Sequence, residues 1–208
     1  MSGWARSERA DLVELMRRLG PDAPTACEGW TTAHMAAHLY VRERRPDAGP
    51  GVAVGGPFAA HTDRVMESVM RVHTFDDVLA RVAGGPPLLW RPMDESFNHV
   101  EYFVHHEDVR RANGEGPRDL PAEQEAAIWN RVRRSLRLSL RRARGVQVEV
   151  VAENGGRAVV GGSGPTVRMT GPVGDILLFT FNRKDIAQVE LTGDEDAVAL
   201  LREARLGL

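Results

Sequence analysis

Apolar residues recur every three or four positions along the first two thirds of the chain, which is the spacing of amphipathic helices. The pattern predicts one helix from a cap at Ser7 to Leu19 and another from a cap at Thr31 or Thr32 to Pro46. Further helices are predicted over 58–72, 75–83, 93–112 and 121–144. Four of these helices are long, and connections of short or medium length favour their packing as a bundle.

After Gly145 the apolar period changes from about three and a half to two. The segments VQVEVVAE, RAVVG, TVRMTG and AQVELTG are predicted to be strands, and 173–181 and 194–204 to be helices. We therefore expect an α+β protein with two domains: a four-helix bundle over 1–144 and a small C-terminal α+β domain over 145–208.

The composition narrows the class of protein. Apolar residues make up 42% of the 208 residues, which is enough for a substantial core, and the formal net charge is only -2. That balance does not favour a nucleic acid or an anionic membrane as partner, so we expect a small-molecule ligand. A single cysteine excludes an intramolecular disulfide, and no signal peptide or membrane-spanning stretch is evident. These features predict a cytoplasmic protein, either a monomer or a homodimer.

A polar stripe runs along the helix predicted over 93–112. Asp94, Asn98, Glu101, His105 and Asp108 follow one another at intervals of four, three, four and three, so they share one face. Apolar residues lie on both sides of this stripe, which directs it into the bundle. Each unpaired polar group there would cost on the order of 1–3 kcal/mol, so something must compensate for their burial.

A divalent metal ion is one such compensation. Glu101 and His105, four residues apart on a helix, present a carboxylate oxygen and an imidazole nitrogen to one point. His38 in MAAHLY is the natural third ligand from another helix. Two imidazoles and one carboxylate leave a coordination position open, as in catalytic zinc sites.

Groups around these ligands have candidate supporting roles. Asp108 is placed to accept a hydrogen bond from the free ring nitrogen of a histidine ligand, and Asn98 to bond Glu101, the bound water or a group on another helix. Two alternatives stay open. His34 and His38 are also four residues apart and would form a two-histidine clamp, or Glu101 and His105 would form a solvated surface pair worth a few tenths of a kcal/mol.

The segments CEGWTTAHMAAHL (27–39), EYFVHHEDVRRA (101–112) and GPVGDILLFTFNRKDIAQVELTGDEDAV (171–198) resemble the DinB-like metalloenzyme superfamily. The similarity is to the branch named after mycothiol-dependent maleylpyruvate isomerase, in particular to an actinobacterial subgroup of about this length. It implies a bundle that binds zinc or another divalent ion through His38, Glu101 and His105, closed by a small second domain. In relatives the metal is thought to activate mycothiol or a similar low-molecular-weight thiol.

The resemblance also suggests positions for a thiol cofactor. Arg183 stands where relatives often have a Gly-Arg pair, although here the segment is Asn182-Arg183-Lys184. Arg42, close to His38, is a further candidate for holding a cofactor carboxylate. The C-terminal domain is also predicted to be shorter than in the isomerase, so we do not carry over the isomerase activity itself.

The resulting functional hypothesis is a metal-dependent enzyme of the thiol S-transferase or isomerase type. A metal-bound thiolate would add to an electrophilic substrate. The alternatives are a metal-assisted hydrolase, if water takes the open position, and a non-catalytic metal-containing binding or regulatory module. No residue is assigned a direct catalytic role.

Overall fold

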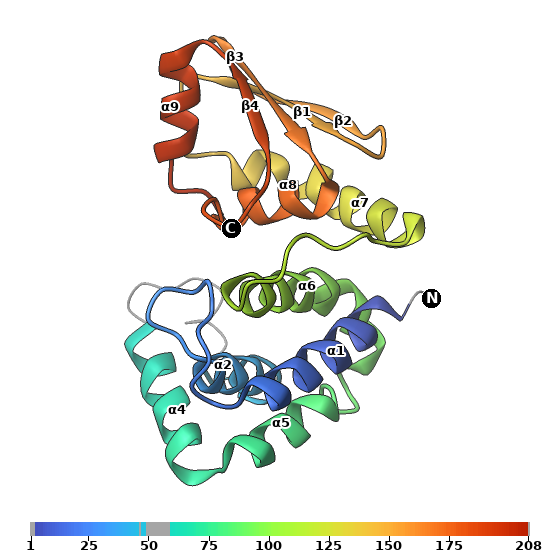
Figure 1. Ribbon diagram of the computed structural model, residues 1–208, viewed down its shortest axis with the longest axis vertical. Coiled ribbons are helices and arrows are strands. Elements are labelled where there is room, and N and C mark those ends of the chain that lie inside the picture. The colour runs from blue at the N-terminus through green and yellow to red at the C-terminus, as the bar shows by residue number, and fades with distance from the viewer. Residues whose placement is uncertain (1–2, 46, 49–58, 208) are drawn as a thin grey trace. The chain divides into compact units, whose positions relative to one another are not determined.

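The computed structural model describes residues 3–45, 47–48 and 59–207. They form two compact units, Met1–Gly116 and Pro117–Leu208. The first contains helices and the second contains a sheet with helices, so the predicted α+β class and N-terminal helical bundle are confirmed (Figure 1).

The first unit consists of packed helices. Its elements are α1 (Trp4–Leu19), α2 (Thr32–Arg44), α4 (Ala59–Val72), α5 (Phe75–Ala83), the 3-10 turn η2 (Arg91–Met93) and α6 (Asp94–Ala112). Helix α1 packs against α5 and α6, and α2 packs against α4 and α5. The core between them is apolar and fully buried, and it includes Leu12, Met16, Met35, Leu39 and Leu79.

Helix α1 begins earlier than the sequence indicated. Its cap position is Gly3, and Ser7 lies inside the helix, so the prediction of a Ser7 cap is wrong. The amide of Ala5 donates to Oε2 of Glu95 on α6 at 3.0 Å. A carboxylate from another helix therefore satisfies one of the free amides of the first turn, and no local cap is needed there.

The start of α2 agrees with the sequence. Thr31 is the cap residue and forms a reciprocal pair with His34, whose Nδ1 accepts from the Thr31 amide at 3.2 Å. Helix α2 is described as far as Arg44, and the predicted stop at Pro46 lies outside the described residues, as does Phe58 before α4.

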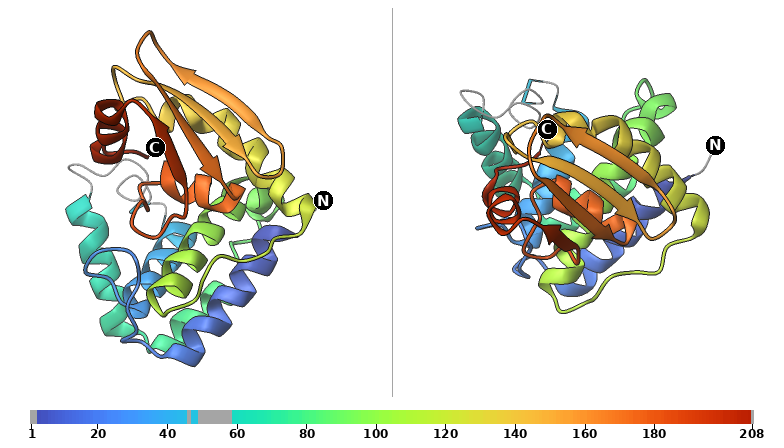
Figure 2. Two further views of the ribbon diagram at one scale, coloured as in Figure 1. Left: turned by 45° about the horizontal axis from the view of Figure 1, so that its top comes forward. Right: turned by 90° about the horizontal axis from the view of Figure 1, so that it is seen from above.

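The second unit contains a four-stranded sheet in the order β2-β1-β3-β4. Its elements are α7 (Ala122–Ser139), β1 (Gln147–Ala152), β2 (Arg157–Gly161), β3 (Thr166–Gly171), α8 (Val173–Thr180), β4 (Glu190–Gly193) and α9 (Glu195–Glu203). Strands β1 and β3 are parallel, whereas β2 and β4 are antiparallel to their neighbours. Helices α7 and α8 pack on each other and on the sheet, and α9 packs on β3 and β4 (Figures 1 and 2).

The boundary between the units differs from the predicted one. Helix α7 was placed in the bundle, with the boundary after residue 144, but it belongs to the second unit, which begins at Pro117. Trp129 of α7 lies so close to the turn between β1 and β2 that a Cβ on Gly156 would come within 2.4 Å of its indole ring. The change of period at Gly145 therefore marks the passage from helix to strand within one unit.

Candidate metal centre

Three predicted ligands come together within the first unit. His38 projects from α2, while Glu101 and His105 project from α6 one turn apart. Oε1 of Glu101 lies 3.5 Å from Nε2 of His38 and 3.2 Å from Nε2 of His105. The three ligand atoms all lie within 4.8 Å of one another.

The position of His38 follows from the sequence of α2 and the loop before it. Ala36 and Ala37 are completely buried, so this part of the helix presents little bulk to its neighbours. The His38 ring lies between two others, with centroids 5.1 Å from the ring of Trp30 and 4.9 Å from the ring of His105. Its orientation is therefore set by packing on both sides.

The polar stripe of α6 continues into a buried network beside the three ligands. Arg9 of α1 donates to both carboxylate oxygens of Asp94 at 3.0 and 2.5 Å and to Glu43 at 2.9 Å. The Tyr102 hydroxyl also donates to Glu43, and the Arg9 guanidinium lies 4.5 Å from the centre of the Tyr102 ring. Asn98 donates to Asp94 at 2.6 Å. Charged partners from other helices thus compensate for the burial of much of the polar stripe.

Arg9 and Glu43 are not among the residues predicted for the site, although their positions in the sequence carry a signal. Arg9 stands three residues before Leu12 on the apolar stripe of α1, and Glu43 stands four residues after Leu39 on that of α2. A charged residue in a core position needs a buried partner. Two such residues of opposite charge, together with the polar stripe of α6, are the sequence pattern expected for a buried network of ion pairs.

The two arginines proposed for cofactor binding have different surroundings. Arg42 donates from Nε to Oε1 of Glu101 at 3.1 Å, and its guanidinium also bonds Oδ1 of Asn98. It therefore places a positive charge directly beside the three ligands. Arg183 lies in the second unit and donates to the Phe181 carbonyl at 3.1 Å. Cofactor binding by either residue stays a prediction.

Burial and neighbours perturb the protonation of the ligands. Burial lowers the pKa of His38, and its contact with Glu101 offsets only part of this shift. Burial would raise the pKa of Glu101, but the close approach of His105 and His38 outweighs that effect and holds the pKa well below its ordinary value. At neutral pH, therefore, His38 is a neutral imidazole and Glu101 an ionised carboxylate, the forms that bind metal ions.

His105 has the opposite shift. Burial would lower the pKa of His105, but hydrogen bonds with Asp108, Cys27 and Glu101 outweigh it. The pKa of this imidazole is consequently raised well above its ordinary value, so His105 carries an extra proton when no cation is present. A cation that binds at Nε2 must displace that proton.

Asp108 is placed to fix the orientation of His105. Its carboxylate is completely buried, and Oδ2 lies 3.0 Å from Nδ1 of His105. The backbone carbonyl of Asp108 accepts from the amide of Ala26, which ties the loop before α2 to α6. A carboxylate on the far ring nitrogen is the usual support of a metal-binding histidine.

Cys27 also lies beside His105 and Asp108. Its sulfur is 3.3 Å from Oδ2 of Asp108. The loop over 20–31 brings both Cys27 and Trp30 to the site, and no periodicity in the sequence could have shown this.

The residues present fit a divalent ion. Nε2 of His38 is buried and has no hydrogen-bond partner among residues 3–45, 47–48 and 59–207, and its contact with Glu101 is long, at 3.5 Å. Metal bonds of about 2.0–2.1 Å in a tetrahedron separate two ligand atoms by roughly 3.3 Å. The two contacts of Glu101 Oε1, at 3.2 and 3.5 Å, bracket that separation.

The other histidines of the first unit are used differently. His34 is occupied by the cap of α2, so it does not form the alternative clamp with His38. Nδ1 of His106 lies 2.8 Å from Oε2 of Glu8, a buried pair between α6 and α1. His61 is about half exposed and contacts Asp47 at 3.4 Å.

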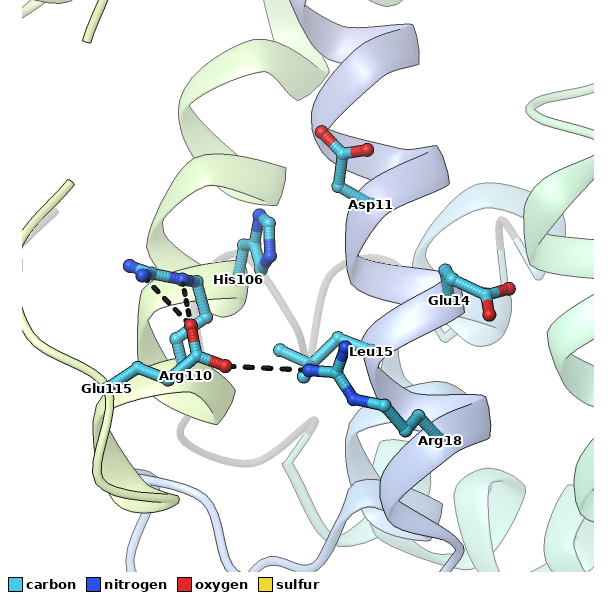
Figure 3. Close-up of a pocket in the computed structure, with 7 residues that line it drawn as sticks. All are labelled: Asp11, Glu14, Leu15, Arg18, His106, Arg110 and Glu115. Atoms are coloured by element: carbon cyan, nitrogen blue, oxygen red, sulfur yellow. Dashed lines mark hydrogen bonds and ion pairs between the residues drawn. The ribbon is translucent and has the colours of Figure 1, made fainter. Parts of the chain in front are cut away.

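A shallow pocket of about 190 Å³ lies beside His106, between α1 and α6 (Figure 3). Glu115 pairs there with Arg110 at 3.0 Å and with Arg18 at 3.6 Å. These charges neutralise one another, so the pocket offers no unpaired group to a ligand comparable with His38.

Comparisons with known proteins identify the fold. No protein-family model and no curated protein matches the sequence. Two crystal structures of the mycothiol-dependent maleylpyruvate isomerase match the structure, one of them a histidine-to-alanine mutant, with TM-scores of 0.55 and 0.57. Each is 15% identical in sequence and aligns over 91% of this chain and 90% of that chain. The fold expected from the resemblance is confirmed.

The aligned region is nearly the same fraction of this chain and of the isomerase chain, and the shorter C-terminal domain stays a prediction. Within the described segments, none of the helices combines the length and apolar character that crossing a membrane requires.

Proposed function

We propose that this protein is a divalent-metal-dependent enzyme that activates a low-molecular-weight thiol for attack on an electrophilic substrate. The observation that carries the proposal is the convergence of His38, Glu101 and His105 from two helices around one point. The shared fold with an isomerase named as mycothiol-dependent supports a thiol as the co-substrate.

The donor set favours zinc as a catalytic ion. Two imidazole nitrogens and one carboxylate oxygen suit zinc and leave one position free for an exogenous ligand. An ion held there would lower the pKa of a bound thiol, so that a thiolate nucleophile is present at neutral pH.

The protein groups around the ion have distinct tasks in this proposal. His38, kept neutral by burial, supplies a lone pair without first losing a proton. Asp108 holds the proton on Nδ1 of His105 and so directs Nε2 toward Glu101. Arg42 lies beside Glu101, where its guanidinium is placed to hold a carboxylate of the thiol or the substrate. The reaction type is thiol transfer, or isomerisation through a thiol adduct.

Elemental analysis tests the premise of a metal. Purified protein should contain about one divalent ion per chain, and His38→Ala should lose it. His61→Ala is the matched control, because this histidine is about half exposed and lies outside the ligand group. Equal metal content in wild type and His38→Ala would overturn the proposal.

A thiol titration then tests the function. With cobalt in place of the native ion, mycothiol should change the visible spectrum and add a sulfur-to-cobalt charge-transfer band, whereas S-methylated mycothiol should not. A metal-containing protein that shows no thiol response would exclude thiol activation. Hydrolysis of esters or amides by that protein would then favour a hydrolase, and its absence a binding module.

A further inference from the structure

The two ring nitrogens of His105 face two different sets of ligand atoms. Nε2 points to Glu101 and His38, whereas Nδ1 points to Asp108 and Cys27. Cys27, His105 and Asp108 form a second group in which one ligand atom from each residue lies within 4.8 Å of the other two. We propose that this group is a second metal position, selective for thiophilic ions such as Cd²⁺, Zn²⁺ or Cu⁺, and that it shares His105 with the first.

The distances suit a metal centre. Oδ2 of Asp108 lies 3.0 Å from Nδ1 of His105 and 3.3 Å from Sγ of Cys27. Ligand atoms at bonding distance from one tetrahedral ion are separated by roughly 3.3 Å for nitrogen and oxygen, and slightly more when one of them is sulfur. The two distances to Asp108 Oδ2 thus lie close to those of a bound ion.

The charges also balance. In the metal-free arrangement the thiol and Nδ1 each donate a hydrogen to the same carboxylate oxygen, because an ionised carboxylate only accepts. A divalent ion would replace these two protons, which leave to solvent. The bonds formed are from the metal to sulfur, nitrogen and oxygen, and the exchange of two protons for one doubly charged ion leaves the net charge of this buried site unchanged.

The donor chemistry sets the selectivity. A thiolate is a soft ligand and favours Cd²⁺, Cu⁺ and Zn²⁺ over Mg²⁺, Ca²⁺ or Mn²⁺. The first group contains no sulfur, so it does not share this preference. Cys27 is half-buried, whereas Asp108 is completely buried.

The two positions exclude each other. When Nδ1 binds an ion, the remaining ring proton resides on Nε2 and is donated to Glu101, which removes His105 from the first group. Occupying both positions would require an imidazolate, with no proton on either ring nitrogen. A thiophilic ion at the second position is therefore expected to displace the ion of the first.

Cadmium titration of the full chain tests this inference. Cys27 is the only cysteine, so any thiolate-to-cadmium charge-transfer band in the ultraviolet reports on this position alone. The titration uses four proteins freed of metal: wild type, His38→Ala, Cys27→Ser and the double variant. Circular dichroism and thermal unfolding establish that each is folded.

We expect the charge-transfer band in wild type and in His38→Ala, because the second group does not use His38. Adding Cys27→Ser to His38→Ala should abolish the band and weaken cadmium binding at least about tenfold. Cadmium affinity unchanged by Cys27→Ser in that background would overturn the inference. A band that disappears in His38→Ala would also overturn it, since Cys27 would then belong to the first group.

The outcome is separable from that of the proposed function. If His38→Ala does not lower the native metal content in the Cys27→Ser background, where the second position is absent, the proposed function fails, while the cadmium result still stands on Cys27. If Cys27→Ser has no effect, only the second position fails. In wild-type protein loaded with cobalt at the first position, one equivalent of Cd²⁺ should reduce the cobalt d–d absorption, and Cys27→Ser should prevent that reduction.

Discussion

Nε2 of His38 on α2 lies 3.5 Å from Oε1 of Glu101 on α6, and Nε2 of His105 approaches the same oxygen at 3.2 Å. The carboxylate of Glu101 is thus the common partner of the two histidines. Arg42 shares it as well, at 3.1 Å. In the absence of a cation, the Glu101 carboxylate contacts His38, His105 and Arg42. These contacts hold the two histidines in position for an incoming ion.

Replacing Glu101 by glutamine should therefore show how much of the metal affinity depends on the charge of this side chain and not on its shape. Glu101→Gln keeps the volume of the side chain but removes the anion that Arg42 and His105 share. We expect the affinity for zinc to fall by about 10–100-fold or more, measured by competition with a chromogenic chelator. Glu14→Gln, on the exposed side of α1, is the control and should bind zinc as wild type does. Unchanged affinity in Glu101→Gln would contradict the predicted ligand set.

Asp108→Asn should weaken the same site indirectly. The substitution preserves size but removes the negative charge that fixes the proton on Nδ1 of His105. Loss of such a supporting carboxylate typically lowers metal affinity by about 10–100-fold. The measurement is again chelator competition, with the exposed Asp76→Asn as the matched control. If Asp108→Asn and the control bind zinc equally, Asp108 does not orient the ligand.

Arg9→Met should destabilise the first unit strongly. The side chain of Arg9 is 4% exposed and that of its partner Glu43 is 2% exposed, so the variant leaves a buried carboxylate without its cation. Breaking a buried pair in this way costs about 3–5 kcal/mol in the free energy of unfolding, which urea denaturation measures.

The surface pair between Arg17 and Glu14 supplies the comparison. Both side chains are largely exposed, so Arg17→Met should change the free energy of unfolding by less than about 0.5 kcal/mol. Equal losses in Arg9→Met and Arg17→Met would show that the buried network does not stabilise the fold.

His99 offers a prediction of the opposite sign. Its Nε2 is buried and has no hydrogen-bond partner within the described segments, so an apolar side chain should be better tolerated. We expect His99→Leu to raise the free energy of unfolding by about 1 kcal/mol at pH 8.

The pH dependence gives an independent check. Burial lowers the pKa of His99, and Glu95 and Glu8 offset only part of that shift. The unfolded chain therefore binds a proton, near pH 6.5, before the folded protein does. Wild type should lose stability as the pH falls through about 6.5 toward the folded pKa, and His99→Leu should lose less. Parallel stability curves for the two proteins between pH 5 and 8 would contradict the burial of a neutral imidazole.

Several elements were predictable because their signals are local. Helix α5 and strands β2 and β3 have the bounds that the apolar period and the flanking turn residues indicated. By contrast, β4 begins at Glu190, three residues later than the alternation suggested. The pairing of β4 with β3 covers only Glu190 to Gly193, and the alternation before Glu190 has no strand to pair with in the described sheet.

In the site, too, local relationships were predictable and contacts between separate helices were not. Glu101 and His105 lie one turn apart on a helix, so their spacing alone predicts that they face the same point. His34 is not a ligand because its Nδ1 accepts a hydrogen bond from the amide of Thr31, the cap residue of α2. The buried partners Arg9 and Glu43 left only a weak signal, because a charged residue on an apolar stripe does not specify which helix carries its partner.

The sequence by itself determined the order and type of most helices and strands, and the face of α6 on which polar groups align, because these depend on the geometry of one element. Only the tertiary structure decided that α7 packs on the sheet, that His38 meets Glu101, and that the loop over 20–31 brings Cys27 to Asp108. These relationships depend on how separate elements pack, and packing is set by the shapes and charges of side chains distant in the chain, which no local period records.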